Sequence, residues 1–262
     1  MRFGVNFFPS FLPEQKSGAQ YFAECLNLVE RADQLGFASV RIVEHHFKPY
    51  GGASPNPIVF LSAASQRAPH VRLVTGAVVP AFNHPLKYAG ELAMLDCISG
   101  GRLDAGFARA FLPDEFEAFG VATEDSRARY EEGIAACVRL WTEENVTFQG
   151  RFHRWENVTV YPRPEQKPHP PVWVAAIGTP QSFEWAGKMG YNLMLSRPER
   201  CSSNVNTIRN VFSCNPAFSR HLAIDIDQVG VSAKPRSTRG PPLPFATLPG
   251  PTEPHYDVAP AT

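Results

Sequence analysis

The sequence lacks any apolar run of the roughly 18 residues that a membrane span needs, and no signal peptide precedes its first predicted strand at 2–8. It also lacks an excess of either charge, since 25 Lys and Arg stand against 25 Asp and Glu. A neutral chain offers no electrostatic footprint for nucleic acid or an anionic membrane surface. We therefore expect a cytoplasmic protein whose partner is a small-molecule substrate.

Cysteine is scarce and shows no recurrent spacing. The five cysteines are odd in number and form no CxxC pair, which argues against a disulfide framework and against a zinc site. They are Cys25, Cys97, Cys137, Cys201 and Cys214. No GxGxxG motif follows a predicted strand, so the sequence gives no sign of an NAD(P)H-binding unit. We expect reduced thiols and no metal.

Strand-like and helix-like segments alternate from Met1 to Ser196. The predicted strands are 2–8, 39–44, 71–79, 102–107, 171–176 and 192–195; the predicted helices are 20–35, 58–66, 85–98, 126–141 and 180–188. The runs 73–79 and 172–176 are apolar on both faces, as in a parallel sheet that is covered on both sides. The pattern predicts an α/β fold with a buried parallel sheet.

The repeat predicts an incomplete TIM-barrel-like (β/α)8 fold. A full barrel needs eight βα units in about 250 residues, whereas six strands are used up by Leu195. Residues 197–262 contain ten prolines and no helical or strand period, so we expect an irregular, partly disordered Pro-rich C-terminal tail. The expected domains are a barrel domain at 1–196 and a tail at 197–262.

A polar cluster directly follows the second predicted strand. Glu44, His45 and His46 stand at its carboxyl end, where α/β folds place their chemistry. Adjacent side chains on a strand point to opposite faces, so one imidazole at most enters the barrel interior. For the same reason the three contiguous side chains cannot converge on one metal ion. A hydrogen-bonded structural pair is the alternative to a catalytic histidine.

Eleven motifs in consistent order and spacing resemble the bacterial-luciferase-like, flavin-dependent monooxygenase family over residues 1–196. They are Gly36-Phe37, Glu44-His45-His46-Phe47, Asn56-Pro57, Thr75-Gly76-Ala77-Val78-Val79, His84-Pro85, Leu95-Asp96, Ser99-Gly100-Gly101-Arg102, Gly106 with Arg109, Ser126-Arg127, Tyr161-Pro162 and Glu184-Trp185-Ala186. The resemblance ends at Ser196. Members of the family continue through two more βα units that are not found in this sequence.

The resemblance implies a site for FMN. His45 matches the imidazole beside the reactive edge of the flavin, and Glu44 flanks it. Gly76-Ala77 matches a non-prolyl cis peptide beneath the isoalloxazine ring. A neutral imidazole there could act as a base or as a hydrogen-bond partner in oxygen chemistry.

The resemblance also implies a phosphate pocket. Its residues would be Arg109, Arg127, Gly178, Thr179 and Ser182. Arginine gives charge-assisted bonds to phosphate, and a helix starting near Pro180 offers free N–H groups. Two simpler explanations stay open: Thr179 could only cap this helix, and Arg127 could only pair with a nearby carboxylate.

The family's activity predicts a two-component monooxygenase. Reduced FMN from a separate flavin reductase would react with O₂ and oxygenate a small apolar substrate, as in alkanal monooxygenases, and the protein would be a homodimer. Relatives that use a deazaflavin (F420) for hydride transfer are one alternative. A non-catalytic, flavin-binding truncated homologue is the other.

Two segments between the predicted strands and helices have their own sequence signals. Residues 111–120 are a substrate-facing lid or an ordinary packed loop, and 146–148 with 152–155 form a predicted β-hairpin around the turn at Gln149-Gly150.

Overall fold

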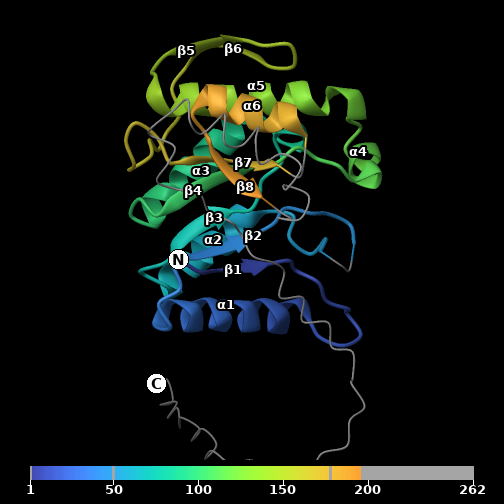
Figure 1. The fold of residues 1–262 in the computed structure, drawn as a ribbon, viewed down its shortest axis with the longest axis vertical. Coiled ribbons are helices and arrows are strands. Elements are labelled where there is room, and N and C mark those ends of the chain that lie inside the picture. Colours follow the sequence, from blue (N-terminus) through green and yellow to red (C-terminus); the bar gives the residue numbers. More distant parts are fainter. Residues whose placement is uncertain (1, 49–50, 177–178, 196–262) are drawn as a thin grey trace, which may run out of the picture. The chain divides into compact units, whose positions relative to one another are not determined.

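A computed structural model describes residues 2–48, 51–176 and 179–195. Six strands form one parallel sheet in the order β1-β2-β3-β4-β7-β8, and Figure 1 shows them with their arrowheads toward the side where α4 lies. The strands are β1 (Gly4–Phe7), β2 (Ser39–Ile42), β3 (Arg72–Thr75), β4 (Leu103–Phe107), β7 (Val172–Ala176) and β8 (Asn192–Leu195). The predicted α/β fold with six parallel strands is confirmed.

The helices follow the strands around a curled sheet. They are α1 (Gly18–Gln34), α2 (Pro57–Arg67), α3 (Pro85–Ile98), α5 (Ser126–Thr142) and α6 (Pro180–Met189). In turn, α1 packs beside α2, α2 beside α3, and α3 beside α5, while α6 packs on β7 and β8. This arrangement is a half-barrel, as expected when βα units succeed one another without closing the ring.

The first helix shows why these segments fold as predicted. Ser17 caps α1 in a capping box with Gln20, so the helix begins two residues before the predicted start. Cys25, Val29 and Ala32 lie three or four residues apart and are buried against the sheet, as expected of the apolar face of an amphipathic helix.

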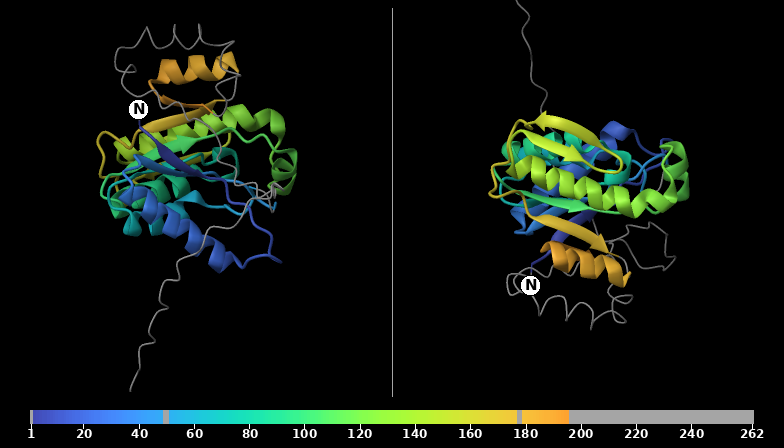
Figure 2. Two further views of the ribbon diagram at one scale, coloured as in Figure 1. Left: turned by 60° about the horizontal axis from the view of Figure 1, so that its bottom comes forward. Right: turned by 90° about the horizontal axis from the view of Figure 1, so that it is seen from above.

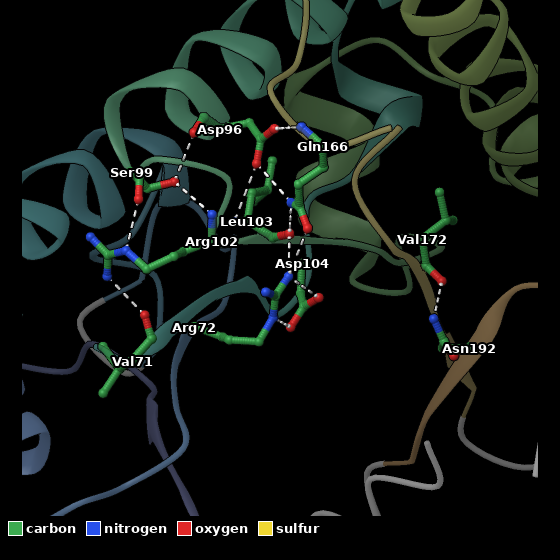
Figure 3. Close-up of polar contacts among 10 residues, drawn as sticks. All are labelled: Val71, Arg72, Asp96, Ser99, Arg102, Leu103, Asp104, Gln166, Val172 and Asn192. Atoms are coloured by element: carbon green, nitrogen blue, oxygen red, sulfur yellow. Dashed lines mark hydrogen bonds and ion pairs between the residues drawn. The ribbon is translucent and has the colours of Figure 1, made fainter. Parts of the chain in front are cut away.

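Hydrogen bonds fix the amino-terminal ends of β3 and β4 (Figure 3). Arg72 makes a bidentate ion pair with Asp104, in which Nε and Nη2 donate to the two carboxylate oxygens at 2.7 and 2.8 Å. The fully buried Asp96 accepts from the backbone N–H and the side-chain amide of Gln166, at 2.9 and 2.7 Å. Arg102 donates to three backbone carbonyls that end α2 and precede β3. These contacts belong to the edge opposite the strands' carboxyl ends, so their role is structural.

Two segments differ from the predicted elements. β3 was expected over 71–79 but ends at Thr75, and Val78 then forms a single bridge with Phe107. The segment predicted as a lid or a packed loop contains a short helix, α4 (Pro113–Ala118). Two 3₁₀ turns, η1 (Pro80–Phe82) and η2 (Thr123–Asp125), complete the loops after β3 and before α5.

The predicted hairpin is present as β5 (Val146–Gln149) and β6 (Arg154–Val158). The carboxylate of Glu132 on α5 accepts from the backbone N–H groups of Arg151, Phe152 and His153 in its turn. Figure 2 shows the hairpin lying along α5. The turn is thereby attached to this helix.

Within the described ranges, no helix is both long enough and apolar enough to cross a membrane. The predicted tail at 197–262, and with it the predicted domain boundary after Ser196, lies outside the described residues.

Candidate active site

Glu44 and His46 lie on the same side of the chain just beyond β2. Glu44 is only 3% exposed, and its carboxylate accepts from the backbone N–H of Val79 at 2.9 Å and the side-chain amide of Asn83 at 3.1 Å. The Nε2 atom of His46 lies 3.3 Å from Oε1 of the same carboxylate. Glu44 therefore joins the loop after β2 to the loop after β3.

His45 points away from this pair, as the strand alternation predicted. Its Nδ1 atom lies 3.1 Å from Oε1 of Glu115 on α4, and its ring packs between the rings of Phe8 and Phe111 at centroid distances of 5.6 and 5.7 Å. The side chain is 14% exposed. Sequence reasoning did not single out Glu115, because it lies 70 residues away in a segment interpreted only as a lid or loop.

Aromatic side chains enclose His46. The ring of Phe119 lies 4.9 Å from His46 edge-on, and it stacks on Phe82 at 4.5 Å. Phe82 also contacts Phe116 of α4 at 5.4 Å. At the surface, an ion pair of 2.8 Å between Lys48 and Asp114 also joins the loop after β2 to α4. The α4 segment is thus packed against the loops that follow β2 and β3.

The Gly76–Ala77 peptide bond is cis, as the family resemblance implied. A Cβ atom at Gly76 would overlap the side chain of Arg41, at 2.0 Å from its Cγ. The Arg41 guanidinium donates from Nε to Asn6 at 3.1 Å, and burial lowers the pKa of this arginine to about 10. Only glycine therefore lets the backbone approach the side chain of this partly buried arginine so closely.

Arg127, Ser182 and Thr179 lie together where α5 and α6 begin. The Nη2 atom of Arg127 is 3.4 Å from Oγ of Ser182, which lies 3.1 Å from Oγ1 of Thr179. Thr179 is the N-cap of α6, followed by Pro180, as predicted, yet its hydroxyl bonds to Ser182 rather than to a backbone N–H. Arg127 also pairs with Glu131 at 3.4 Å, which is the carboxylate pairing named as the simpler explanation for this arginine. Gly178 lies outside the described residues.

Tyr130 on α5 lies within electrostatic reach of Arg127 and Arg109. Burial raises its pKa far above the ordinary value and Glu131 adds to that, whereas Arg127 and Arg109 oppose the rise because they attract the phenolate. Arg109 itself is exposed. Among the described residues, the buried Tyr130 hydroxyl has no hydrogen-bond partner. The guanidinium of Arg127 and the hydroxyls of Ser182 and Thr179 form a donor set that fits a phosphate group.

Both groups of side chains lie at the carboxyl edge of the parallel sheet. His45 and Glu115 follow β2 and β4, Arg109 also follows β4, and Thr179 follows β7. This is the edge at which barrels and open α/β sheets bind their ligands. Across the described ranges, no group of three His, Cys, Asp or Glu side chains is arranged to hold a metal ion.

Known proteins resemble this chain over most of its length. It is 51% identical in sequence to the monooxygenase RslO1 from Streptomyces bottropensis, whose crystal structure superposes with a TM-score of 0.79 over 83% of this chain and 67% of that one. It is 36% identical to the oxygenase component of flavin-dependent trigonelline monooxygenase from Acinetobacter baylyi, over 75% of this chain and 54% of that protein.

A relative with a different cofactor in its name is also similar. The F420-dependent glucose-6-phosphate dehydrogenase of Intrasporangium calvum is 34% identical over 67% of this chain. The chain spans about half the length of this and the preceding curated relative, 54% of each. The profile of the family described as luciferase-like monooxygenase matches residues 1–214, past the point where the motif resemblance ends. The chain belongs to the luciferase-like monooxygenase family.

Proposed function

We propose that the protein is the oxygenase component of a two-component, FMN-dependent monooxygenase, which receives reduced FMN from a separate reductase and uses O₂ to oxygenate a small apolar substrate. The contact of Arg127 with Ser182, beside Thr179 at the start of α6, carries the proposal, because it supplies a charge-assisted donor set for a phosphate. The names of RslO1 and of trigonelline monooxygenase agree with an oxygenating role. A homodimer remains a prediction of the family resemblance.

In this proposal the cofactor phosphate would be held by Arg109, Arg127, Thr179 and Ser182, with Gly178 completing the loop, and the ring would lie near Gly76 and Ala77. The free N–H groups at the start of α6 add a positive dipole end. Bound reduced flavin supplies the electrons for the reaction with O₂. The protein contributes the binding, the orientation and the exclusion of water.

His45 would be the catalytic residue, since histidine is the side chain that most often accepts and returns a proton in catalysis. Packing between Phe8 and Phe111 limits water at the ring. Glu44, which we predicted as its catalytic neighbour, has its carboxylate in contact with Val79, Asn83 and His46. Its part in the proposal is therefore to hold the two loops in place.

Calorimetric titration with oxidised and reduced FMN under anaerobic conditions tests the proposal. We expect binding of at least one form, weakened about 10- to 100-fold in Arg127→Ala, because a hydrogen bond to a charged group contributes about 1.5–3 kcal/mol. Arg139→Ala is the matched control, since this half-exposed arginine lies at the other end of the same helix, where its partners among the described residues are Glu143 and the carbonyl of Thr147. Absence of heat from both forms, or unchanged affinity in Arg127→Ala, would refute the proposed site.

A hydride transferase that uses a deazaflavin is the second candidate, favoured by the 34% identity to an F420-dependent dehydrogenase. Its cofactor would also need a phosphate site, so binding of FMN alone does not separate the two. Reduced FMN with air should support substrate oxygenation in the first case. F420 should support anaerobic substrate oxidation in the second. A folded protein that binds flavin but catalyses neither reaction would instead be the predicted non-catalytic homologue.

A further inference from the structure

Glu115 is the least exposed carboxylate near the candidate catalytic histidine. It is 1% exposed, and its Oε1 atom makes two contacts at once: it accepts from the backbone N–H of His46 at 2.8 Å and lies 3.1 Å from Nδ1 of His45. A buried carboxylate needs such partners, because removing it from water is costly. The two contacts hold one oxygen in a fixed place relative to the imidazole of His45.

This geometry selects one form of the His45 ring. An ionised carboxylate can only accept hydrogen bonds, so the contact with Oε1 requires a proton on Nδ1 of His45. In the neutral ring, Nε2 then carries the free lone pair. The nitrogen that is protonated in a histidine is generally set by the hydrogen bond that the other nitrogen makes.

The residues on both sides of Glu115 contact neighbouring loops. Phe116, the next residue of α4, packs on Phe82 at 5.4 Å, and Asp114, the preceding one, pairs with Lys48 at 2.8 Å. The rings of Phe8 and Phe111 restrict rotation of His45 itself. The carboxylate is therefore held in position, as a group that orients a catalytic side chain must be.

We infer that Glu115 is a positioning residue: it holds His45 as the Nδ1–H tautomer, so that Nε2 is the nitrogen that accepts and returns the proton. The chemical use of that nitrogen rests on the proposed function. The tautomer itself belongs to the ligand-free protein and can be measured without flavin or substrate.

The test is ¹⁵N NMR of the full-length protein with labelled histidine at pH 8.5, with the His45 signals identified by their loss in His45→Asn. The ¹⁵N shifts of the two ring nitrogens show which one is protonated. We expect a single Nδ1–H form in the wild type and in Glu115→Gln, whose amide oxygen can still accept. In Glu115→Ala the ring should change to a majority Nε2–H form. Glu117→Gln, the matched control, removes an exposed carboxylate of the same helix and should leave the ring unchanged.

A wild-type His45 protonated on Nε2, or a folded Glu115→Ala variant that keeps the Nδ1–H form, overturns the inference. If Glu115→Ala does not fold, the wild type and Glu115→Gln still test the inference. A His45 ring without a proton on Nδ1 in either protein contradicts the role of residue 115 as the hydrogen-bond acceptor. FMN affinity, measured in parallel, should change less than twofold in Glu115→Gln. Failure of FMN to bind the wild type would refute the proposed function and leave the tautomer result standing.

Discussion

The hydroxyl of Ser182 lies 3.4 Å from the guanidinium of Arg127, a residue 55 positions earlier in the chain. The contact exists because β7 pairs directly with β4, so the helices that follow these strands begin side by side although the β5–β6 hairpin separates them in sequence. Candidate phosphate ligands from two βα units are thus brought together by the topology of the sheet.

Replacing Glu44 with Gln should destabilise the protein by about 1–3 kcal/mol, because the amide nitrogen cannot accept from Val79, Asn83 or His46 and one buried donor loses its partner. Urea unfolding measures the change. Glu117→Gln is the control, since this carboxylate of α4 is exposed. Equal unfolding midpoints for the two variants would contradict the role assigned to Glu44.

Gly106 is expected to tolerate no side chain. A Cβ atom there would lie 2.0 Å from the backbone oxygen of Thr75 and 2.6 Å from Cε of Met194, so Gly106→Ala must push β3 and β4 apart. We expect the free energy of unfolding to fall by about 3 kcal/mol, as is found when side chains are enlarged in a packed core. Gly90→Ala on α3 is the control, because the new methyl group would lie 3.7 Å from Val160, an ordinary contact distance. Its free energy of unfolding should rise by up to about 1 kcal/mol, because alanine favours a helix more than glycine does. Thermal unfolding of both variants checks the contrast.

Asp96 should be the critical carboxylate of the network in Figure 3. It is fully buried and accepts from Gln166 twice and from the backbone of Leu103, so Asp96→Ala leaves several donors unpaired. We expect destabilisation of about 3 kcal/mol. Glu91→Ala on the same helix removes only a surface pair with Lys87 and should cost less than about 0.5 kcal/mol. Chemical denaturation measures the free energy of unfolding of both variants. A decrease in Asp96→Ala as small as that in Glu91→Ala would show that the network is dispensable for stability.

His84 should make stability depend on pH. Partial burial and the neighbouring His153, whose ring lies 5.0 Å away, lower the pKa of His84. The unfolded chain, with a histidine pKa of about 6.5, therefore binds more protons than the native one as the pH falls, so stability declines from about pH 7.5 to 5.5.

The variant His84→Asn should reduce this decline. Asn keeps an acceptor for the backbone N–H of Leu86, which His84 caps at the start of α3, and removes the titrating ring. Melting temperatures measured across this pH range should fall less steeply in the variant. An identical slope in the two proteins would assign the pH dependence to other groups.

The regular elements could be predicted from the sequence because their signals are local. The stripe of Cys25, Val29 and Ala32 defines α1, and the doubly apolar run at 172–176 defines β7. The predicted end of β3 was four residues too late, because Val78 and Val79 continue the apolar pattern after the strand has ended. Helix α4 was not predicted because its six residues are too few to show a helical period.

The candidate site was predictable only in part. Motif resemblance pointed to His45, Arg127 and Ser182, and local geometry could place none of their partners. The contact of Glu115 with His45 joins residues on different βα units, and no periodicity in the sequence encodes such a pair. Long-range contacts of this kind follow from the strand order, which becomes visible only in three dimensions.

The indole of Trp185 on α6 packs against Tyr130 at 5.4 Å and Tyr191 at 5.5 Å. This placement gives the chain a built-in optical reporter. If a ligand binds at Arg127 as proposed, the surroundings of Tyr130 and of Trp185 should change, so Trp185 emission, measured with the other three tryptophans replaced, should follow binding on a stopped-flow instrument without an added dye.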